Sequence, residues 1–361
     1  MSTLLQVEHL EKLYPVNTPG ATLAKLRGDR QSHKLHAVDD VSFQIEAGES
    51  IGLVGESGCG KSTLVRLVTR LIDPTGGAIR FDGTDIGATP AGQFARSPAR
   101  AHIQMVFQDP TDSLNPRYTA FDTIAEPLRL LAGMLDPAQI RARVEELADQ
   151  TGLPQVLLPR FPHQLSGGQK ARVGIARAIA LKPRLLILDE PTAALDVSVQ
   201  AIILHLLADL RQQLGMSYLF VSHDLNIVRL LCNRVIVMYL GKVVESGPVD
   251  ALFRNPQHPY TQALIGAIPN VDGAKNQPPQ PNTDHALPRR LAGEPMSPID
   301  PDPNVCRFYG RCPKSGGRCN TEMPLLHACA PQHEVACHFP GDHPGHYPGR
   351  RPGQSSSGGH T

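Results

Sequence analysis

One eight-residue segment limits the fold of this chain more than any other. It reads Gly-Glu-Ser-Gly-Cys-Gly-Lys-Ser over residues 55–62 and follows the apolar run Ile51–Val54. The spacing G-x-x-x-x-G-K-[ST] between a strand and a helix is typical of a phosphate-binding loop, because glycines let backbone N–H groups close around phosphate oxygens. Background residue frequencies give a chance match in a chain this long at roughly 1%. The segment therefore predicts a nucleotide-binding α/β fold.

The loop and a second motif predict the groups that handle the nucleotide. Lys61 is expected to reach the β and γ phosphates and Ser62 to ligate magnesium, while the helix N-terminus adds partial positive charge. After the apolar run Leu185–Leu188, Asp189 is expected to hold magnesium and Glu190 to orient and deprotonate a water. Acidic residues often end strands, so this pair is informative only in combination with the phosphate loop.

Periodicity predicts the frame around these motifs. Residues 41–46 alternate between apolar and polar, and the apolar runs 185–188 and 218–221 resemble buried parallel strands, whose C-terminal ends are where open parallel sheets bind ligands. Asp136 suits an N-cap and Pro137 the first helical position, so a helix is expected to follow them.

Two stretches are expected to lie outside this frame. Residues 16–36 contain Gly, Pro, Asn and basic residues with little periodicity, which predicts an exposed loop. After about residue 270 the chain holds 15 of its 33 prolines and 5 of its 7 cysteines, so long helices are improbable there. The Gly-, Ser- and Pro-rich residues 348–361 predict a flexible tail.

Composition excludes several classes of protein. Hydrophobic residues make up 41% and charged residues 19%, and the formal net charge is +1, which is ordinary for a globular protein and does not suggest nucleic acid as the main partner. No run of about 18 apolar residues occurs, so no membrane span is expected. Glu8 and Glu11 stand where an export signal would be basic and then apolar, so a thiol-reducing cytosol is expected.

A third motif identifies the family. Residues 165–169, Leu-Ser-Gly-Gly-Gln, resemble the signature of ABC ATPases, and the three motifs together identify the chain as a member of that family. The resemblance implies an ABC-type P-loop ATPase core with a helical subdomain, which hydrolyses ATP to ADP and phosphate. The nucleotide contacts that it implies are Tyr14, Gly55, Ser57, Gly58, Cys59, Gly60, Lys61, Ser62, Thr63, Ser166, Gly167, Gly168, Gln169 and Asp196.

The resemblance also implies individual roles. Gln108 would contact magnesium and the attacking water, so the implied magnesium ligands are Ser62, Gln108 and Asp189. His223 would lie near the γ phosphate, and the implied catalytic residues are Glu190, His223 and Gln108. Standing alone, His223 would be equally compatible with a structural role at a strand end. Tyr14 matches the aromatic that stacks on adenine; simple packing is its alternative, because a long insertion separates it from the core.

Finer resemblance points to the oligopeptide and dipeptide importer group. The segments GESGCGKSTL, FQDPTDSLNPR, FPHQLSGGQ, VSHDL, VMYLGKVVESGPV and NPQHPYTQAL carry it. It implies an ATP-binding domain over residues 1–265 with its helical subdomain at about 111–169, a C-terminal extension over 266–340 and a tail over 341–361. SGGQ and IARA resemble the second of the two nonidentical ATPases that serve such importers.

Such ATPases work in pairs, the signature of one closing over the phosphate loop of the other. The implied partners are a second nonidentical ATPase, two membrane permease subunits and an extracellular or periplasmic peptide-binding protein, with this chain peripheral on the cytoplasmic face of the inner membrane. Nickel, glutathione or another small solute is the alternative cargo. One rival class is a soluble ABC ATPase that acts in DNA repair or on ribosomes; it is disfavoured because the chain has a single ATPase cassette and no heptad repeat of a coiled coil. The other is a non-catalytic regulatory or structural subunit, which is disfavoured because the expected catalytic groups are present.

Four cysteines predict a further site. Cys306, Cys312, Cys319 and Cys337 are spaced C-x5-C-x6-C-x17-C in a proline-rich segment that has little means of building a core. A reducing cytosol disfavours disulfides, so a bound metal is the expected cross-link of this segment. An iron-sulfur cluster is one form of it, and zinc or free thiols are the alternatives. The peptide-importer resemblance implies a 4Fe-4S cluster. Nothing in the sequence connects these residues to the phosphate site, so a structural or redox-sensing role is expected.

Overall fold

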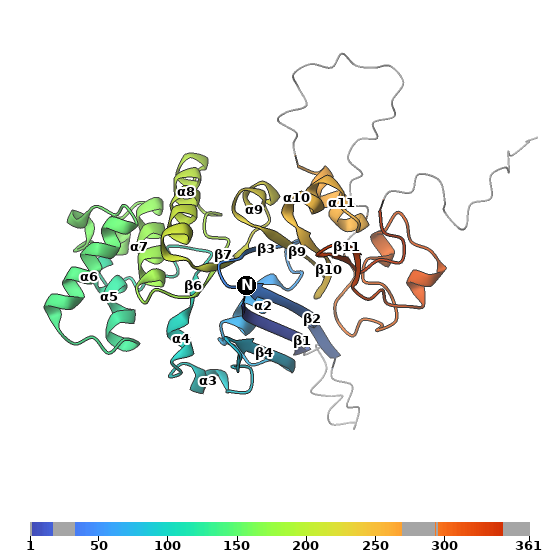
Figure 1. The fold of residues 1–361 in the computed structure, drawn as a ribbon, viewed down its shortest axis with the longest axis horizontal. Helices are drawn as coiled ribbons and strands as arrows, with labels where there is room; N and C mark the ends of the chain where they lie inside the picture. Colours follow the sequence, from blue (N-terminus) through green and yellow to red (C-terminus); the bar gives the residue numbers. More distant parts are fainter. Residues whose placement is uncertain (1, 17–32, 269–292, 294, 342–361) are drawn as a thin grey trace, which may run out of the picture.

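The computed structural model describes residues 2–16, 33–268, 293 and 295–341. Its centre is an eight-stranded sheet, with helices along one side and a smaller sheet on the other (Figure 1). Across the large sheet the order is β11 (His327–Ala330), β12 (His333–Val335), β10 (Lys242–Pro248), β9 (Arg234–Tyr239), β3 (Ser50–Val54), β8 (Ser217–Val221), β7 (Leu185–Asp189) and β6 (Ile103–Val106).

The five strands from β9 to β6 pair in parallel. The predictions of buried strands at 51–54, 185–188 and 218–221 are confirmed, since these residues form β3, β7 and β8. Because parallel strands end at one edge of the sheet, the loops after β3, β7 and β8 are brought together there. The phosphate-binding motif, Glu190 and His223 lie in those loops, and Asp189 is the last residue of β7.

The central strands are buried on both faces, which explains their continuous apolar runs. Leu186 and Leu188 of β7 point into a core shared with helices, and Leu185 and Ile187 point into a second core on the opposite face. The helices on the first face are α8 (Val197–Leu214), α9 (Leu225–Leu231), α10 (Val249–Arg254) and α11 (Pro259–Gly266). The second core contains α2 (Lys61–Val68) and the smaller sheet.

The smaller sheet corrects the two ends of the loop expected over residues 16–36, because Val16 and residues 33–36 belong to strands. Its order is β2 (His33–Glu46), β1 (Thr3–Val16), β4 (Gly76–Phe81) and β5 (Thr84–Asp85). Val16 pairs with His33, and Pro15 with Lys34, so both ends of the expected loop belong to an antiparallel ladder that satisfies their backbone groups whatever the side-chain pattern. Residues 17–32 lie outside the described residues.

A helical lobe stands beside the sheet (Figure 1). It contains α5 (Ala120–Leu130), α6 (Pro137–Gln150) and α7 (Gly167–Ile179), with 3-10 turns at Gln155–Leu157 and Pro162–Gln164; short helices α3 (Ala91–Phe94) and α4 (Ala99–His102) precede β6. The predicted helix after Asp136 is confirmed: the Asp136 carboxylate accepts from the Ala138 N–H at 2.9 Å, and Pro137 is the first helical residue. No helix in the described ranges has the length and apolar character to cross a membrane.

The C-terminal part packs directly on the large sheet. In residues 295–341 the chain forms 3-10 turns at Tyr309–Arg311 and Gly317–Asn320 and then the hairpin β11–β12, whose second strand pairs with β10. Phe308 is fully buried against the main core. Residues 269–292 and 342–361 of the predicted extension and tail lie outside the described residues.

Candidate nucleotide site

The loop after β3 is shaped by glycines that no other residue could replace without strain. Gly55 and Gly60 have φ of 152° and 107°, a region that side-chain-bearing residues rarely adopt. A Cβ on Gly60 would lie 2.2 Å from the carbonyl oxygen of Ala37, and one on Gly55 would lie 2.3 Å from that of Met238. The backbone can therefore curl tightly only with glycine at these positions.

Lys61 begins α2 and is folded into the loop. Its side chain is almost fully buried, and Nζ donates to the carbonyl oxygens of Gly55 at 2.7 Å and Glu56 at 3.0 Å. No side chain accepts a hydrogen bond at the N-terminus of α2, so the first backbone N–H groups of this helix can donate to a bound ligand. A buried cation beside uncapped N–H groups is a site for a phosphate. The other predicted contacts of the segment are Ser57, Gly58, Cys59, Ser62 and Thr63.

Three predicted catalytic side chains, from the segments after β6, β7 and β8, meet at one point. Glu190 follows β7 with a φ of 46°, an uncommon conformation for a non-glycine residue, and its N–H donates to the Val221 carbonyl at 3.0 Å. One carboxylate oxygen of Glu190 accepts from Gln108 Nε2 at 3.2 Å and lies 3.3 Å from His223 Nδ1. Residues far apart in the sequence thus converge on a single oxygen atom.

Asp189 lies one residue earlier and is more buried than Glu190. Burial raises the pKa of its carboxyl, and the negative charge of Glu190 raises it further, while Arg66 and Lys61 act in the opposite direction. Asp189 therefore lies within electrostatic reach of both the phosphate-loop lysine and the second carboxylate. Oxygen ligands beside a phosphate site suit Mg²⁺, whose charge would favour the ionised form of Asp189.

The predicted signature lies in the helical lobe, at the start of α7. Ser166 caps the helix: its Oγ accepts from the Gln169 N–H at 3.3 Å, and its own N–H donates to Gln169 Oε1 at 2.9 Å. Gly168 faces α8 so closely that a Cβ would lie 2.7 Å from Val199 Cγ1, and a Cβ on Gly167 would lie 3.2 Å from Leu195 Cδ2. Asp196 caps α8 by accepting from the Val199 N–H at 3.0 Å. Figure 1 shows α7 well separated from α2.

Tyr14 lies near the end of β1, opposite Leu35 of β2. It is half-buried, and the Lys12 ammonium lies 5.2 Å from its ring centroid. The long insertion thus does not separate Tyr14 from the core, because the strand that follows the insertion pairs with it. Its stacking on adenine stays a prediction.

The four cysteines approach one another without forming a ligand set. Cys306, Cys312, Cys319 and Cys337 line one small cavity, which Phe308 also lines. Burial raises the pKa of Cys312 to about 12 and of Cys337 to about 11, and neighbouring cysteines contribute to both shifts. Within the described residues no three His, Cys, Asp or Glu side chains are arranged to hold a metal ion. The iron-sulfur cluster stays a prediction.

A residue beside one of these cysteines reaches the phosphate loop. The sequence suggested no connection between the cysteines and the phosphate site, yet Arg311, which directly precedes Cys312, pairs with Glu56 in the phosphate loop. Tyr260 of α11 also reaches the loop, accepting from the Glu56 N–H at 2.7 Å. Sequence reasoning missed these residues because contacts across more than 200 positions leave no local pattern.

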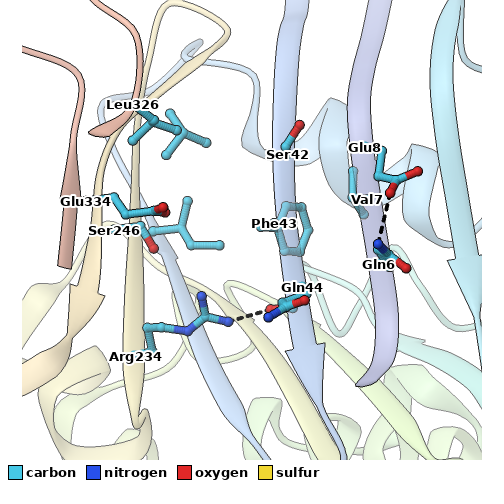
Figure 2. Close-up of a pocket in the computed structure, with 12 residues that line it drawn as sticks. Gln6, Val7, Glu8, Ser42, Phe43, Gln44, Arg234, Ser246, Leu326 and Glu334 are labelled. Carbon is cyan, nitrogen blue, oxygen red and sulfur yellow. Dashed lines mark hydrogen bonds between the residues drawn. The ribbon is translucent and has the colours of Figure 1, made fainter. Parts of the chain in front are cut away.

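A separate cavity of about 310 Å³ lies between β2 and the β9–β10 pair (Figure 2). Phe43 and Val243 give it an apolar wall, and Arg234 at its rim donates to the carbonyl oxygen of Gln44. Its described lining contains none of the predicted site residues, so it is distinct from the nucleotide site.

Comparisons with known proteins agree with this geometry. Residues 38–193 match the family model for ABC transporters, and residues 244–319 match that for the oligopeptide/dipeptide transporter C-terminal region. The chain is 42% identical to the di/tripeptide transport ATP-binding protein DppF of Pseudomonas aeruginosa, over 94% of this chain and 98% of that protein. It is 43% identical to the oligopeptide transport ATP-binding protein AppF of Bacillus subtilis, over 93% and 97% of the two chains.

Solved structures give the same fold. The ATP-binding cassette MJ0796, as a dimer bound to ADP and Pi, has a TM-score of 0.59 and 28% identity, covering 68% of this chain and 99% of that one. Clostridium perfringens cbiO1 has a TM-score of 0.57 and 31% identity, covering 70% and 92%. The predicted ABC-type P-loop α/β core is confirmed. The chain belongs to the ATP-binding proteins of ABC transporters, within the group that carries the oligopeptide/dipeptide transporter C-terminal region.

Proposed function

We propose that this ATPase hydrolyses ATP with Glu190 as the base that activates water. The observation that carries the proposal is the meeting of Gln108 and His223 at one carboxylate oxygen of Glu190. A carboxylate placed in this way can accept a proton from water while the two neighbours orient the nucleophile and contact the γ phosphate. The products are ADP and phosphate.

Lys61 and Asp189 complete the proposed chemistry. Lys61 neutralises the β and γ phosphates at the start of α2, and Ser62, Gln108 and Asp189 supply the oxygens that hold Mg²⁺. Tyr14 stacks on adenine. When bound, the metal neutralises charge that develops on the phosphates, while this chain's own groups position the water and receive its proton.

The site is proposed to be completed by a second ATPase subunit. The signature residues 166–169 begin α7 in a lobe apart from the phosphate loop, so within one chain they do not cover the nucleotide (Figure 1). In a pair, each signature closes over the other subunit's phosphate loop, and Asp196 lies at the contact. ATP then joins the subunits and hydrolysis releases them.

We infer that the transported cargo is a dipeptide or oligopeptide. The support is the C-terminal region match over residues 244–319 and the printed names of DppF and AppF. Nickel, glutathione or another small solute is the alternative. The proposed assembly contains a nonidentical ATPase, two permeases and an extracellular or periplasmic peptide-binding protein, with this chain on the cytoplasmic face of the inner membrane.

A groove beside Gln108 is the proposed contact for a permease. It has a volume of about 290 Å³ and is lined by Leu71, Phe107 and Leu130, which are all exposed. Phe107 directly precedes Gln108, so an element seated there would touch the segment that carries the water-orienting amide. Exposed apolar side chains around a concave surface are typical of a protein interaction site.

Co-purification and reconstitution test this function. The chain, tagged and expressed with its membrane partners, is expected to copurify with two permeases and a second ATPase, and liposomes containing the assembly should accumulate labelled dipeptide only with ATP. The isolated chain should be a weak ATPase. Cargo-stimulated transport by a homodimer would overturn the heterodimer, and accumulation of nickel or glutathione in place of peptide would overturn the peptide assignment.

For the cysteines, we propose a 4Fe-4S cluster held by Cys306, Cys312, Cys319 and Cys337. Support comes from their shared cavity and from the mutual effect of the thiols on their pKa values, both of which require proximity. Four cysteine thiolates are ligands that suit iron-sulfur or zinc. The cluster would staple a segment that is poor in regular structure.

Metal analysis after anaerobic purification tests the cluster. We expect iron and acid-labile sulfide at about four atoms each per chain, and loss of both in Cys312→Ser. Stoichiometric zinc without iron, or no metal, would contradict it.

A further inference from the structure

We propose that Arg311 and Tyr260, both outside the nucleotide motifs, are positioning residues for ATP binding, because they hold Glu56 and with it the phosphate loop. The proposal rests on the proposed ATP site. It assigns to the C-terminal part of the chain a direct influence on nucleotide affinity.

Glu56 is held at every polar group that it has. Arg311 donates to its two carboxylate oxygens at 2.7 and 3.1 Å. Its backbone N–H donates to the Tyr260 hydroxyl at 2.7 Å, and its carbonyl oxygen accepts from Lys61 Nζ at 3.0 Å. Two of these three attachments come from residues 244–319, which match the oligopeptide/dipeptide transporter C-terminal region, and the third comes from the residue that is proposed to bind phosphate.

Arg311 is itself firmly placed. Its side chain is 7% exposed and lies with its guanidinium 5.8 Å from the ring centroid of Tyr239, whose hydroxyl accepts from it at 3.3 Å. Phe308, three residues earlier, packs edge-on against Tyr239 and Tyr260 with centroid distances of 5.1 and 5.6 Å. The aromatic cluster therefore fixes both Arg311 and Tyr260 relative to the end of β9, which pairs with β3 before the phosphate loop.

Charge explains why this arrangement matters for ATP. Glu56 places a carboxylate in a loop that must receive the negative phosphates, and a like charge at short range opposes binding. The bidentate Arg311 neutralises that carboxylate and orients it at the same time. Without Arg311, the loop would keep its glycines and Lys61 but would present an uncompensated negative charge beside them.

Binding of Mg-ATP by full-length variants tests the proposal. Arg311→Met should raise the Kd for Mg-ATP about 10-fold, as expected for loss of a charged hydrogen-bond pair. The double variant Glu56→Gln with Arg311→Met should return to within about 3-fold of the wild type, because the unpaired charge is gone. A purely structural role for Arg311 would not be rescued by a change at Glu56.

Arg318 supplies a matched control. It makes a bidentate pair with Glu322 at 2.8 and 2.8 Å in the same C-terminal part of the chain, but both side chains are exposed and neither has a recorded hydrogen bond to the phosphate loop. Arg318→Met should leave the Kd unchanged. Should Arg311→Met fold poorly, Tyr260→Phe removes only the hydroxyl on the Glu56 N–H and should still weaken binding about 3-fold.

An unchanged Kd in both Arg311→Met and Tyr260→Phe would overturn the inference, as would a double variant as weak as the single one. A different experiment distinguishes failure of the proposed ATP site from failure of this inference. If Lys61→Ala binds ATP normally, the nucleotide site itself is wrongly placed, whereas loss of binding in Lys61→Ala with normal Arg311→Met rejects only the role of Arg311.

Discussion

At the scale of single residues, Lys61 shows how the phosphate loop is prepared for an anion. The ammonium is buried and held by two loop carbonyls, so its charge is already placed at the start of α2. The proposed contact of Lys61 to phosphate would form as soon as ATP binds, so its loss should weaken ATP binding and not the chemical step alone.

Lys61→Ala should raise the Kd for Mg-ATP by about 10-fold or more, since a charge-assisted contact to phosphate is lost. Equilibrium titration with a fluorescent ATP analogue measures it. Lys182→Ala, which removes an exposed lysine from the turn after α7, is the matched control and should bind normally. Tight binding by Lys61→Ala would contradict the loop assignment.

The limits of sequence reasoning are clearest at Glu56. The motif spacing identified Lys61, and strand ends identified Asp189 and Glu190, because these signals are local. Glu56 occupies a position where the motif accepts any residue, and its partner Arg311 is 255 positions away. A contact of that length depends on how the C-terminal segment packs, which no periodicity in either segment encodes.

At the scale of elements, strong local sequence signals were sufficient to predict several strands and one helix. Apolar runs predicted β3, β7 and β8, and a cap followed by proline predicted α6. The sequence did not predict the pairing between Val16 and His33. The ends of these two strands contain polar residues and a proline, a composition that is typical of a loop. Pairing with β1, rather than side-chain pattern, determines the start of β2.

Helix α11 should make the stability of the C-terminal part depend on pH. His258 caps this helix, its Nδ1 accepting from the Tyr260 N–H at 3.1 Å, and burial lowers the pKa of His258 to about 4. The unfolded chain, with a histidine pKa near 6.5, binds more protons below that pH. Stability contributed by the neutral ring is thus full above about pH 6.5 and is lost as the pH falls toward 4.

His258→Asn keeps a cap acceptor but cannot titrate. Between pH 6.5 and 5 the wild type should lose about 2 kcal/mol of unfolding free energy more than the variant does. Denaturant unfolding of both proteins at the two pH values measures the difference, and equal losses would show that His258 is not the titrating group.

At the scale of the whole molecule, the chain carries two separate groups of predicted nucleotide contacts, which we propose belong to two different ATP sites. The phosphate loop and the Glu190 group lie at the edge of the sheet, and the signature lies in the helical lobe (Figure 1). The C-terminal part adds a third contribution, because it contacts the phosphate loop of its own chain through Arg311.

The most direct test of the account is phosphate release by Glu190→Gln in the purified assembly. The substitution keeps the size of the side chain and removes the base, so hydrolysis should fall by about 100-fold or more while the Kd for ATP stays within about 3-fold. Uncleaved ATP should remain bound, with the two ATPase subunits closed together. Phosphate release near the wild-type rate would contradict the role of Glu190 and the mechanism built on it.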